Sequence, residues 1–285
     1  MKYTTSVTNL IKERISRRDY LPTSIENSKL NEIQKIIKKP LIGPFGGKSH
    51  FHLIDTKNED PNYKVRVGTY GMVSGAQYYL ACVTKISKYN TIDSGYSFEK
   101  LILKATDLKL GTVWLGAKFA SKNLAKIIPL SNNEFIPAVS PIGYPKDNLT
   151  IKESFIHWEI KARERKSWTK IFFKDNFSQS LTIEEAGIYS TPLEMVRLAP
   201  SGKNEQPWRI LTNNDLTKFH FYIEKRSKVT SQQISKLNLL DIGIAMSHFD
   251  LTVNELKLNG KWIKEEPELN INGRNLFYIA SWQAK

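Results

Sequence analysis

Hydrophobic residues recur with helical spacing in two N-terminal segments, residues 6–18 and 28–39. In the first segment, Leu10, Ile11 and Ile15 fall on one side of a helix. The second segment repeats the spacing at Leu30, Ile33, Ile36 and Ile37. Such spacing is typical of an amphipathic helix with one buried face, so both segments are predicted to be helices.

Short apolar runs rich in β-branched and aromatic residues predict strands. They are residues 51–54, 78–83, 112–115, 208–211, 219–223 and 276–282. A long helix is predicted to follow Asp93-Ser94-Gly95, and another is predicted to begin at Asp241-Ile242-Gly243. A shorter helix is predicted over residues 192–198, directly before a loop at 199–207.

The two halves of the chain repeat one plan. Each contains a helix, a proline-containing loop, a strand and a long helix opened by Asp-x-Gly. The repeat is weak and its copies have diverged. On its own, it indicates only that the two halves of the chain are related.

The chain has 285 residues and a formal net charge of +14, which permits binding to nucleic acid, an anionic membrane or a phosphorylated ligand. Its lysines are spread along the chain, so most of them are interpreted as a solvated surface, and no nucleic-acid partner is predicted. The single cysteine, Cys82, excludes an internal disulfide and fits a reducing compartment. No segment is apolar enough to cross a membrane, and we expect a cytoplasmic protein.

Several common catalytic patterns are missing from the sequence. Gly43 to Ser49 is similar to a phosphate-binding P-loop, but a glycine would be required at Ile42 and a strand, not a helix, is predicted next. Gly-x-Ser-x-Gly, His-Glu-x-x-His and Cys-x-x-Cys do not occur, so neither a hydrolase nor a zinc site is supported. His50 and His52 alternate along a predicted strand and have no further ligands nearby, so no metal site is predicted.

Two runs of residues, far apart in the sequence, are candidates for ligand binding. The first is Arg14-Ile15-Ser16-Arg17-Arg18-Asp19-Tyr20, and the second is residues 199–209, Ala-Pro-Ser-Gly-Lys-Asn-Glu-Gln-Pro-Trp-Arg. A turn of small and polar residues exposes backbone N–H groups and short side chains to a planar polar ligand. Paired guanidinium groups suit a phosphate because each donates parallel hydrogen bonds.

The order and content of these runs resemble the nitroreductase family of flavoproteins, and more specifically its fused, single-chain members in thermophilic bacteria. In ordinary members of that family, one subunit supplies an N-terminal arginine motif and its partner supplies a Pro-Ser-x-x-Asn-x-Gln-Pro-Trp loop. The resemblance implies an α+β fold of two intertwined, pseudo-symmetric lobes, with mixed sheets wrapped by helices. The two halves, residues 1–170 and 171–285, would form one intimate unit and hold a flavin mononucleotide (FMN) between them. It also implies a monomeric pseudo-dimer or a weak homodimer.

The resemblance also implies roles for individual residues. Arg17, Arg18, Arg163 and Arg165 match the family's basic pairs at the flavin phosphate and ribityl chain. Pro200, Ser201 and Asn204 match the loop against the ring, and Gly116 and Ala117 match the backbone that faces flavin N5. Asp19 belongs to the first motif, where the family usually has serine. Leu21 and Trp114 also depart from the family pattern.

The activity implied by the resemblance is reduction of nitroaromatics or quinones with NAD(P)H, in a ping-pong cycle of hydride transfer. The flavin carries that chemistry, so no catalytic acid or base is assigned. Two alternatives stay open. One is other flavin chemistry on the same fold, such as dehalogenation or flavin breakdown. The other is a basic flavin-storage or nucleic-acid-binding protein without turnover.

Overall fold

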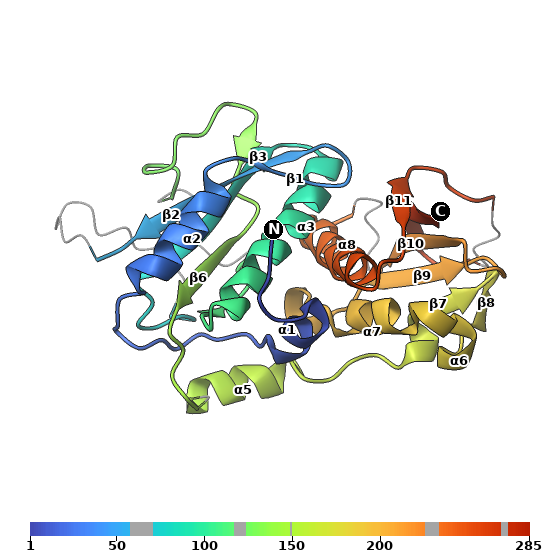
Figure 1. Cartoon of the computed structure of the whole chain (residues 1–285), viewed down its shortest axis with the longest axis horizontal. Coiled ribbons are helices and arrows are strands. Elements are labelled where there is room, and N and C mark those ends of the chain that lie inside the picture. The colour runs from blue at the N-terminus through green and yellow to red at the C-terminus, as the bar shows by residue number, and fades with distance from the viewer. Residues whose placement is uncertain (58–70, 117–123, 149, 226–233, 269–272) are drawn as a thin grey trace.

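The computed structural model of the protein describes residues 1–57, 71–116, 124–148, 150–225, 234–268 and 273–285 (Figure 1). Its first sheet has the order β1-β2-β3-β6-β4, and β5 pairs with β3. All these strand pairs are antiparallel. The strands are β1 (Leu41–Ile42), β2 (Lys48–Asp55), β3 (Tyr78–Lys85), β4 (Gly111–Thr112), β5 (Glu134–Phe135) and β6 (Val139–Gly143).

The second sheet is mixed and has the order β11-β12-β10-β9-β7-β8. Its parallel pair is β7 with β9, in which Phe172 lies opposite Ile210. The strands are β7 (Phe172–Lys174), β8 (Asn176–Ser180), β9 (Trp208–Thr212), β10 (Lys218–Glu224), β11 (Gly260–Ile263) and β12 (Leu276–Ala284). The proposed division at residues 170 and 171 therefore falls between the two sheets, and it stays a prediction about folding units.

Helices lie between and around the sheets. They are α1 (Val7–Glu13), α2 (Asn27–Ile37), α3 (Lys88–Asp107), α5 (Ile151–Glu159), α6 (Ile183–Ala186), α7 (Ser190–Leu198), α8 (Lys236–Glu255) and the 3-10 turns η2 (Trp168–Lys170), η3 (Gly187–Tyr189) and η4 (Gly202–Asn204). The long helices α3 and α8 pack along each other at the centre of the molecule (Figure 1). Within the described ranges, no helix is both long and apolar enough to span a bilayer.

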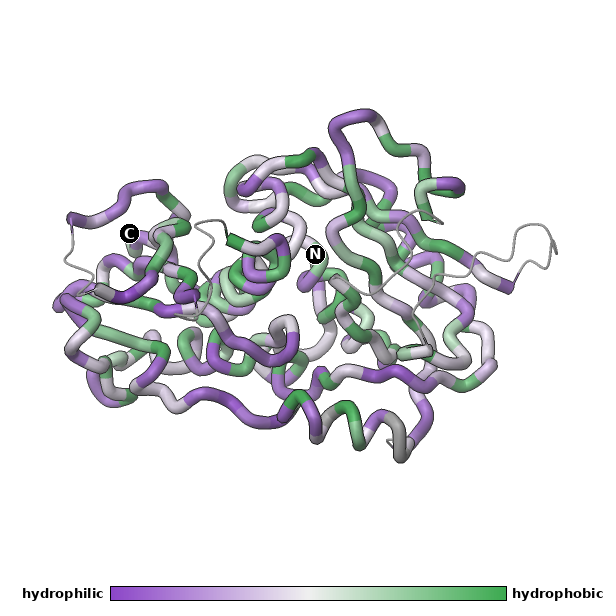
Figure 2. The backbone as a smooth tube through the Cα atoms, turned by 180° about the vertical axis from the view of Figure 1, so that it is seen from behind, coloured by the Kyte–Doolittle hydropathy of each residue, from purple (hydrophilic) through white to green (hydrophobic). Residues whose placement is uncertain are grey.

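The cores of the two halves interlock through these central helices. Ile92 and Tyr96 of α3 are buried in the cluster that covers the second sheet. Leu240 of α8 is buried in the cluster that covers the first sheet. Hydrophobic positions accordingly concentrate in the central helices and the strands, while many outer loops are hydrophilic (Figure 2). The predicted α+β architecture of two intertwined halves is confirmed.

The N-terminal helix is shorter than predicted. Ser6 caps α1 by accepting a hydrogen bond from Asn9, and the helix ends at Glu13. Residues 14–20 then run outside any helix, with Ser16 in a parallel bridge to Thr112. Pairing with the first sheet replaces the helical hydrogen bonds here, so the prediction of a helix over 6–18 is wrong beyond Glu13.

The long helices begin earlier than predicted. The Ser87 side chain caps α3 and the Ser235 side chain caps α8, each by accepting from a backbone N–H three residues later. Asp93 and Asp241 therefore lie within their helices rather than at the start. The strand predicted over 112–115 is also shorter, because β4 ends at Thr112 and Leu115 makes only an isolated bridge with Val139.

Candidate functional site

The loop at 199–207 has an unusual backbone. Lys203, Asn204 and Gln206 have φ angles of 50°, 55° and 47°. Non-glycine residues rarely adopt this left-handed region, and each such residue costs free energy that surrounding contacts must offset. The loop lies between α7 and β9, which are both well packed, so its conformation is imposed by the fold.

Side chains of the loop tie it to the segment that follows α5. Asn204 Nδ2 donates to the carbonyl oxygens of Lys161 and Glu164, at 2.6 and 2.9 Å. Gln206 Oε1 accepts from the Lys166 N–H at 2.8 Å. The loop and residues 161–166 therefore form one unit, although they are separated by about 40 positions in the chain.

Two predicted site residues meet in this unit. Arg165 Nη1 donates to Asn204 Oδ1 at 3.4 Å, and its Nε and Nη2 donate to the Leu198 carbonyl oxygen. Burial, together with the positive charges of Arg14 and Arg197, lowers the pKa of Arg165 to about 10. Such crowding of cations in a buried place favours an anionic ligand, which would relieve the repulsion.

A cavity of about 300 Å³ lies beside this cation cluster. It is lined by Ile11, Lys12, Arg14, Ile15, Ser16, Ala162, Arg163, Arg165 and Leu198. Arg14 comes from the N-terminal run, whereas Arg163 and Arg165 come from the segment bound to the loop. Residues about 150 positions apart thus converge on one small, positively charged space.

The Arg14 side chain is the strongest single feature of the cavity. Its Nη1 is buried and has no hydrogen-bond partner among the described residues. Burial lowers the pKa of Arg14, and the negative charge of Glu99 acts in the opposite direction. A half-buried guanidinium whose Nη1 donor is buried and unused fits an anionic ligand such as a phosphate.

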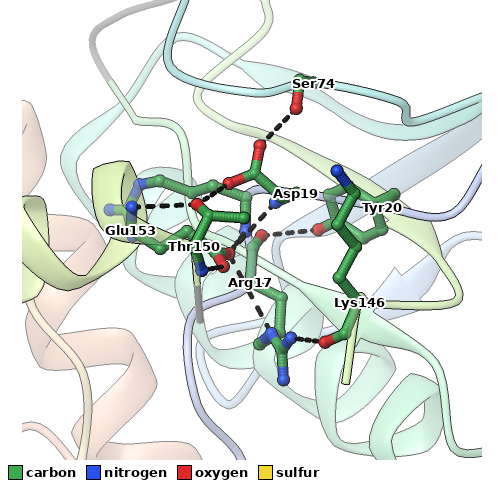
Figure 3. Close-up of polar contacts among 8 residues, drawn as sticks. Arg17, Asp19, Tyr20, Ser74, Lys146, Thr150 and Glu153 are labelled. Carbon is green, nitrogen blue, oxygen red and sulfur yellow. Dashed lines mark hydrogen bonds and ion pairs between the residues drawn. The ribbon is translucent and has the colours of Figure 1, made fainter. Parts of the chain in front are cut away.

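Arg17 lies in a different polar network, beside the start of α5 (Figure 3). Its Nη2 donates to the Lys146 carbonyl oxygen, and its Nε lies 4.0 Å from Glu153 Oε1. Glu153 is fully buried and accepts from the Arg18 and Asp19 backbone N–H groups. Arg17 is not among the described residues that line the 300 Å³ cavity.

Asp19 completes this network. One of its carboxylate oxygens accepts from the Ser74 hydroxyl and the other from the Thr150 hydroxyl (Figure 3). Thr150 and Glu153 also form the capping box of α5. Asp19 therefore fixes the N-terminal run to α5, and these two contacts are structural.

Arg18 belongs to the Glu153 network and, like Arg14, has guanidinium nitrogens without partners among the described residues. Its backbone belongs to the Glu153 network, but its Nε and Nη1 are buried without hydrogen-bond partners in the described part of the chain. Burial lowers the pKa of Arg18, while Glu153, Tyr20 and Asp19 raise it. Arg18 thus remains a candidate cation for a bound anionic group.

The remaining predicted residues lie around α8. A Cβ added to Gly116 would lie 2.6 Å from Leu237 Cδ2, and one added to Gly202 would lie 3.7 Å from Leu237 Cδ1. Leu237 therefore brings Gly116 close to the loop. Ser201 Oγ accepts from the Gln206 N–H at 2.9 Å, and Pro200 beside it is half-buried. Ala117 lies outside the described residues.

Arg163 is exposed and also lines an adjoining cavity of about 810 Å³ with Trp158. The structure thus brings together Arg163, Arg165, Ser201 and Asn204, with Gly116 nearby, and places Arg17 and Asp19 in the α5 network. Sequence reasoning missed Arg14 as a site residue. The signal was present, because Arg14 belongs to the same basic run as Arg17 and Arg18.

Comparisons with known proteins agree on one family. A family model described as "Putative TM nitroreductase" matches residues 6–253. An Archaeoglobus fulgidus protein named "Putative NADH dehydrogenase/NAD(P)H nitroreductase" is 26% identical over 171 residues, which are 56% of this chain and 97% of that protein.

Solved structures show the same fold. The crystal structure of a nitroreductase described as putative, from Thermotoga maritima, matches with a TM-score of 0.61 and 19% identity, over 100% of this chain and 95% of that chain. An FMN-dependent nitroreductase from Clostridium difficile matches 49% of this chain and 87% of its own, with 18% identity and a TM-score of 0.40. Of these two similarities, the full-length match to the Thermotoga maritima structure supports the fold assignment.

Proposed function

The chain belongs to the nitroreductase family, and from this membership we propose that it is an FMN-dependent oxidoreductase that reduces nitroaromatics or quinones with NAD(P)H. The observation that carries the proposal is the convergence of Arg14 with Arg163 and Arg165 on one cavity. Arg165 in turn contacts Asn204 of the strained loop. Two distant runs of the chain thus form the two sides of a single candidate cofactor site.

The cavity fits the phosphate of FMN. Arg14 offers a buried Nη1 without a partner in the described residues, and Arg163 adds a second guanidinium. Guanidinium groups donate charge-assisted hydrogen bonds to phosphate oxygens, each contributing about 1.5–3 kcal/mol when shielded from water. Arg14, Arg163 and Arg165 would hold the phosphate, and Arg18 would add a buried positive charge.

The loop and Gly116 would hold the ring system. The absence of a side chain at Gly116 lets its backbone lie against Leu237 of α8, which places the segment beside the loop. The loop is fixed before the ligand arrives by the Ser201, Asn204 and Gln206 contacts, which reduces the entropy lost on binding.

When bound, the flavin would supply the redox chemistry by accepting a hydride from NAD(P)H and passing two electrons to the oxidant. The residues of this chain would bind, orient and partly desolvate that group. We assign no catalytic acid or base. The two substrates would use the same site in turn, which corresponds to a ping-pong cycle.

Reconstitution of apoprotein with FMN tests the proposal. We expect a yellow holoprotein that NADH or NADPH bleaches without oxygen, and whose colour a nitroaromatic or a quinone restores. Retention of FMN without bleaching would instead indicate flavin storage, and failure to bind FMN would contradict the proposal.

A matched pair of variants links the activity to the cavity. Arg14→Gln removes the buried cation and should weaken FMN binding by roughly tenfold or more. Lys35→Gln makes the same change in net charge on an exposed position of α2 and should leave FMN binding unchanged.

A further inference from the structure

Two aspartates occupy corresponding positions on the central helices but differ in their hydrogen bonds. Asp93 of α3 uses both carboxylate oxygens: Oδ1 accepts from the Phe45 N–H at 3.0 Å and Oδ2 from the Gly47 N–H at 2.6 Å. Asp241 of α8 accepts from the Gly202 N–H through Oδ1 at 3.0 Å. Its Oδ2 is buried and has no hydrogen-bond partner in the part of the chain that the structure describes.

The space around the two carboxyl groups differs in the same way. A Cβ added to Gly47 would lie 2.5 Å from Asp93 Oδ2, whereas one added to Gly202 would lie 3.7 Å from Asp241 Oδ2. The first-half loop closes tightly on its aspartate, and the 199–207 loop does not. Among the described residues, Asp241 therefore has one N–H donor to stabilise a negative charge, where Asp93 has two.

A buried carboxyl group with one unpartnered oxygen is more stable neutral than ionised, because desolvation penalises the charged form most. Burial raises the pKa of Asp241 to about 8; the Gly202 N–H opposes this effect and the charge of Glu205 adds to it. Burial raises the pKa of Asp93 to about 6, and the Phe45 and Gly47 N–H groups oppose it. At pH 7 the two aspartates should thus differ in charge.

The position of Asp241 makes its charge relevant to the candidate site. Through Gly202, Asp241 joins α8 to the strained loop, and the other side of that loop contacts Arg165. Glu205 in the loop is the charged group whose field acts on Asp241. An ionised Asp241 would repel Glu205 and any anion bound by the loop and the cation cluster.

We propose that Asp241 carries a proton on Oδ2 in the native protein, and that it is a positioning residue that keeps loop 199–207 able to bind an anionic, phosphorylated ligand. The protonation stands on the hydrogen-bond geometry alone. The identity of the ligand rests on the proposed function. Ionisation of Asp241 should loosen the Gly202 segment and weaken ligand binding.

Thermal unfolding of the apoprotein tests the protonation without any ligand. Asp241→Asn removes a group whose native pKa exceeds its unfolded pKa, so the wild type should lose stability relative to this variant as pH rises from 5 to 8. Asp93→Asn is the matched control: the pKa of Asp93 is raised only to about 6, so the pH-dependent loss due to Asp93 should end near pH 6, whereas the loss due to Asp241 should continue to pH 8. This control variant places amide hydrogens against an N–H donor, and it should be less stable than the wild type at pH 7. If Asp241→Asn is destabilised as much as Asp93→Asn, with no dependence on pH, the protonation is contradicted.

Titration of apoprotein with FMN at pH 7 and pH 9 tests the positioning role. The phosphate charge is nearly constant over this range because its second pKa is about 6. We expect the wild-type Kd to rise roughly tenfold and the Asp241→Asn Kd to rise less than about twofold. An equal rise in both proteins would overturn the role.

If the Asp241→Asn variant does not fold, a spectroscopic measurement on the wild type still tests the protonation of Asp241. In protein labelled with ¹³C at aspartate carboxyl groups, one resonance should titrate near pH 8, and the absence of any aspartate that titrates above pH 6.5 would overturn the protonation. If the protein binds FMN at neither pH, both the proposed function and the positioning role of Asp241 are wrong. The unfolding data and the carboxyl resonance would still test whether Asp241 is protonated.

Discussion

Gly95 of α3 and Gly243 of α8 each lie against the backbone of the other helix. A Cβ on Gly95 would lie 2.3 Å from the Leu240 carbonyl oxygen, and one on Gly243 would lie 2.1 Å from the Ile92 carbonyl oxygen. Each glycine follows its aspartate by two residues, so the Asp-x-Gly pattern has the same structural role in both halves. The aspartate fixes a loop, and the glycine permits close contact between the halves.

Gly243→Ala should therefore destabilise the whole protein rather than the second half alone. The added methyl group collides with backbone, which cannot move aside like a flexible side chain, and a loss of about 3 kcal/mol is expected. Urea unfolding followed by circular dichroism measures the loss. Asn31→Ala, on the exposed side of α2, should leave stability nearly unchanged, and an equally small effect of Gly243→Ala would contradict the close packing.

Glu153→Ala should disrupt the link between the N-terminal run and α5. Glu153 is fully buried and accepts from the N–H groups of Arg18, Asp19 and Thr150. Its removal leaves buried donors and the Arg17 charge without their acceptor, at a cost of about 3–5 kcal/mol.

Chemical denaturation measures this cost, with Glu266→Ala as the control at an exposed acidic position. Because the run also carries Arg14, the folded Glu153→Ala protein should bind FMN more weakly than the Glu266→Ala protein. Wild-type stability in Glu153→Ala would show that the network does not hold the run in place.

His220 should make the protein sensitive to acid. Burial, together with the Lys218 charge, lowers the pKa of His220 from 6.5 to about 4. Between these values the unfolded chain binds a proton that the native protein does not, so stability is complete above pH 6.5 and falls as pH decreases towards 4. The loss attributable to His220 should be about 2 kcal/mol.

Comparison of unfolding free energies at pH 7 and pH 4.5 measures this contribution. His220→Gln should lose less stability over that interval than the wild type. His50→Gln, which changes an exposed histidine, should retain the wild-type pH dependence. Identical losses in wild type and His220→Gln would contradict the assignment.

The sequence predicted elements best where local pattern and tertiary structure agree. The strands at 219–223 and 276–282 lie within β10 and β12, because apolar and aromatic content coincides with burial there. Helix starts were misplaced because Ser87 and Ser235 act as caps in segments without strong periodicity. The α5 helix was missed, although Thr150 and Glu153 carry a readable capping-box signal.

The candidate site was only partly predictable. The Asn204 loop was found because its residue pattern is specific, whereas its contact with Arg165 was not predicted. The sequence could not show that Arg14 lines the cavity while Arg17 and Arg18 contact Glu153. Adjacent residues of an extended segment point in different directions, and pairing with Thr112 sets which of them faces the cavity.

The central claim is that Arg14, Arg163 and Arg165 hold the phosphate of a flavin. The most direct test compares the Kd of FMN with that of riboflavin, which lacks the phosphate, for the wild type and Arg14→Gln. We predict that the wild type binds FMN at least about 100-fold more tightly and that Arg14→Gln reduces this ratio by about tenfold. Equal affinities of the wild type for FMN and riboflavin, or a ratio unchanged by Arg14→Gln, would contradict it.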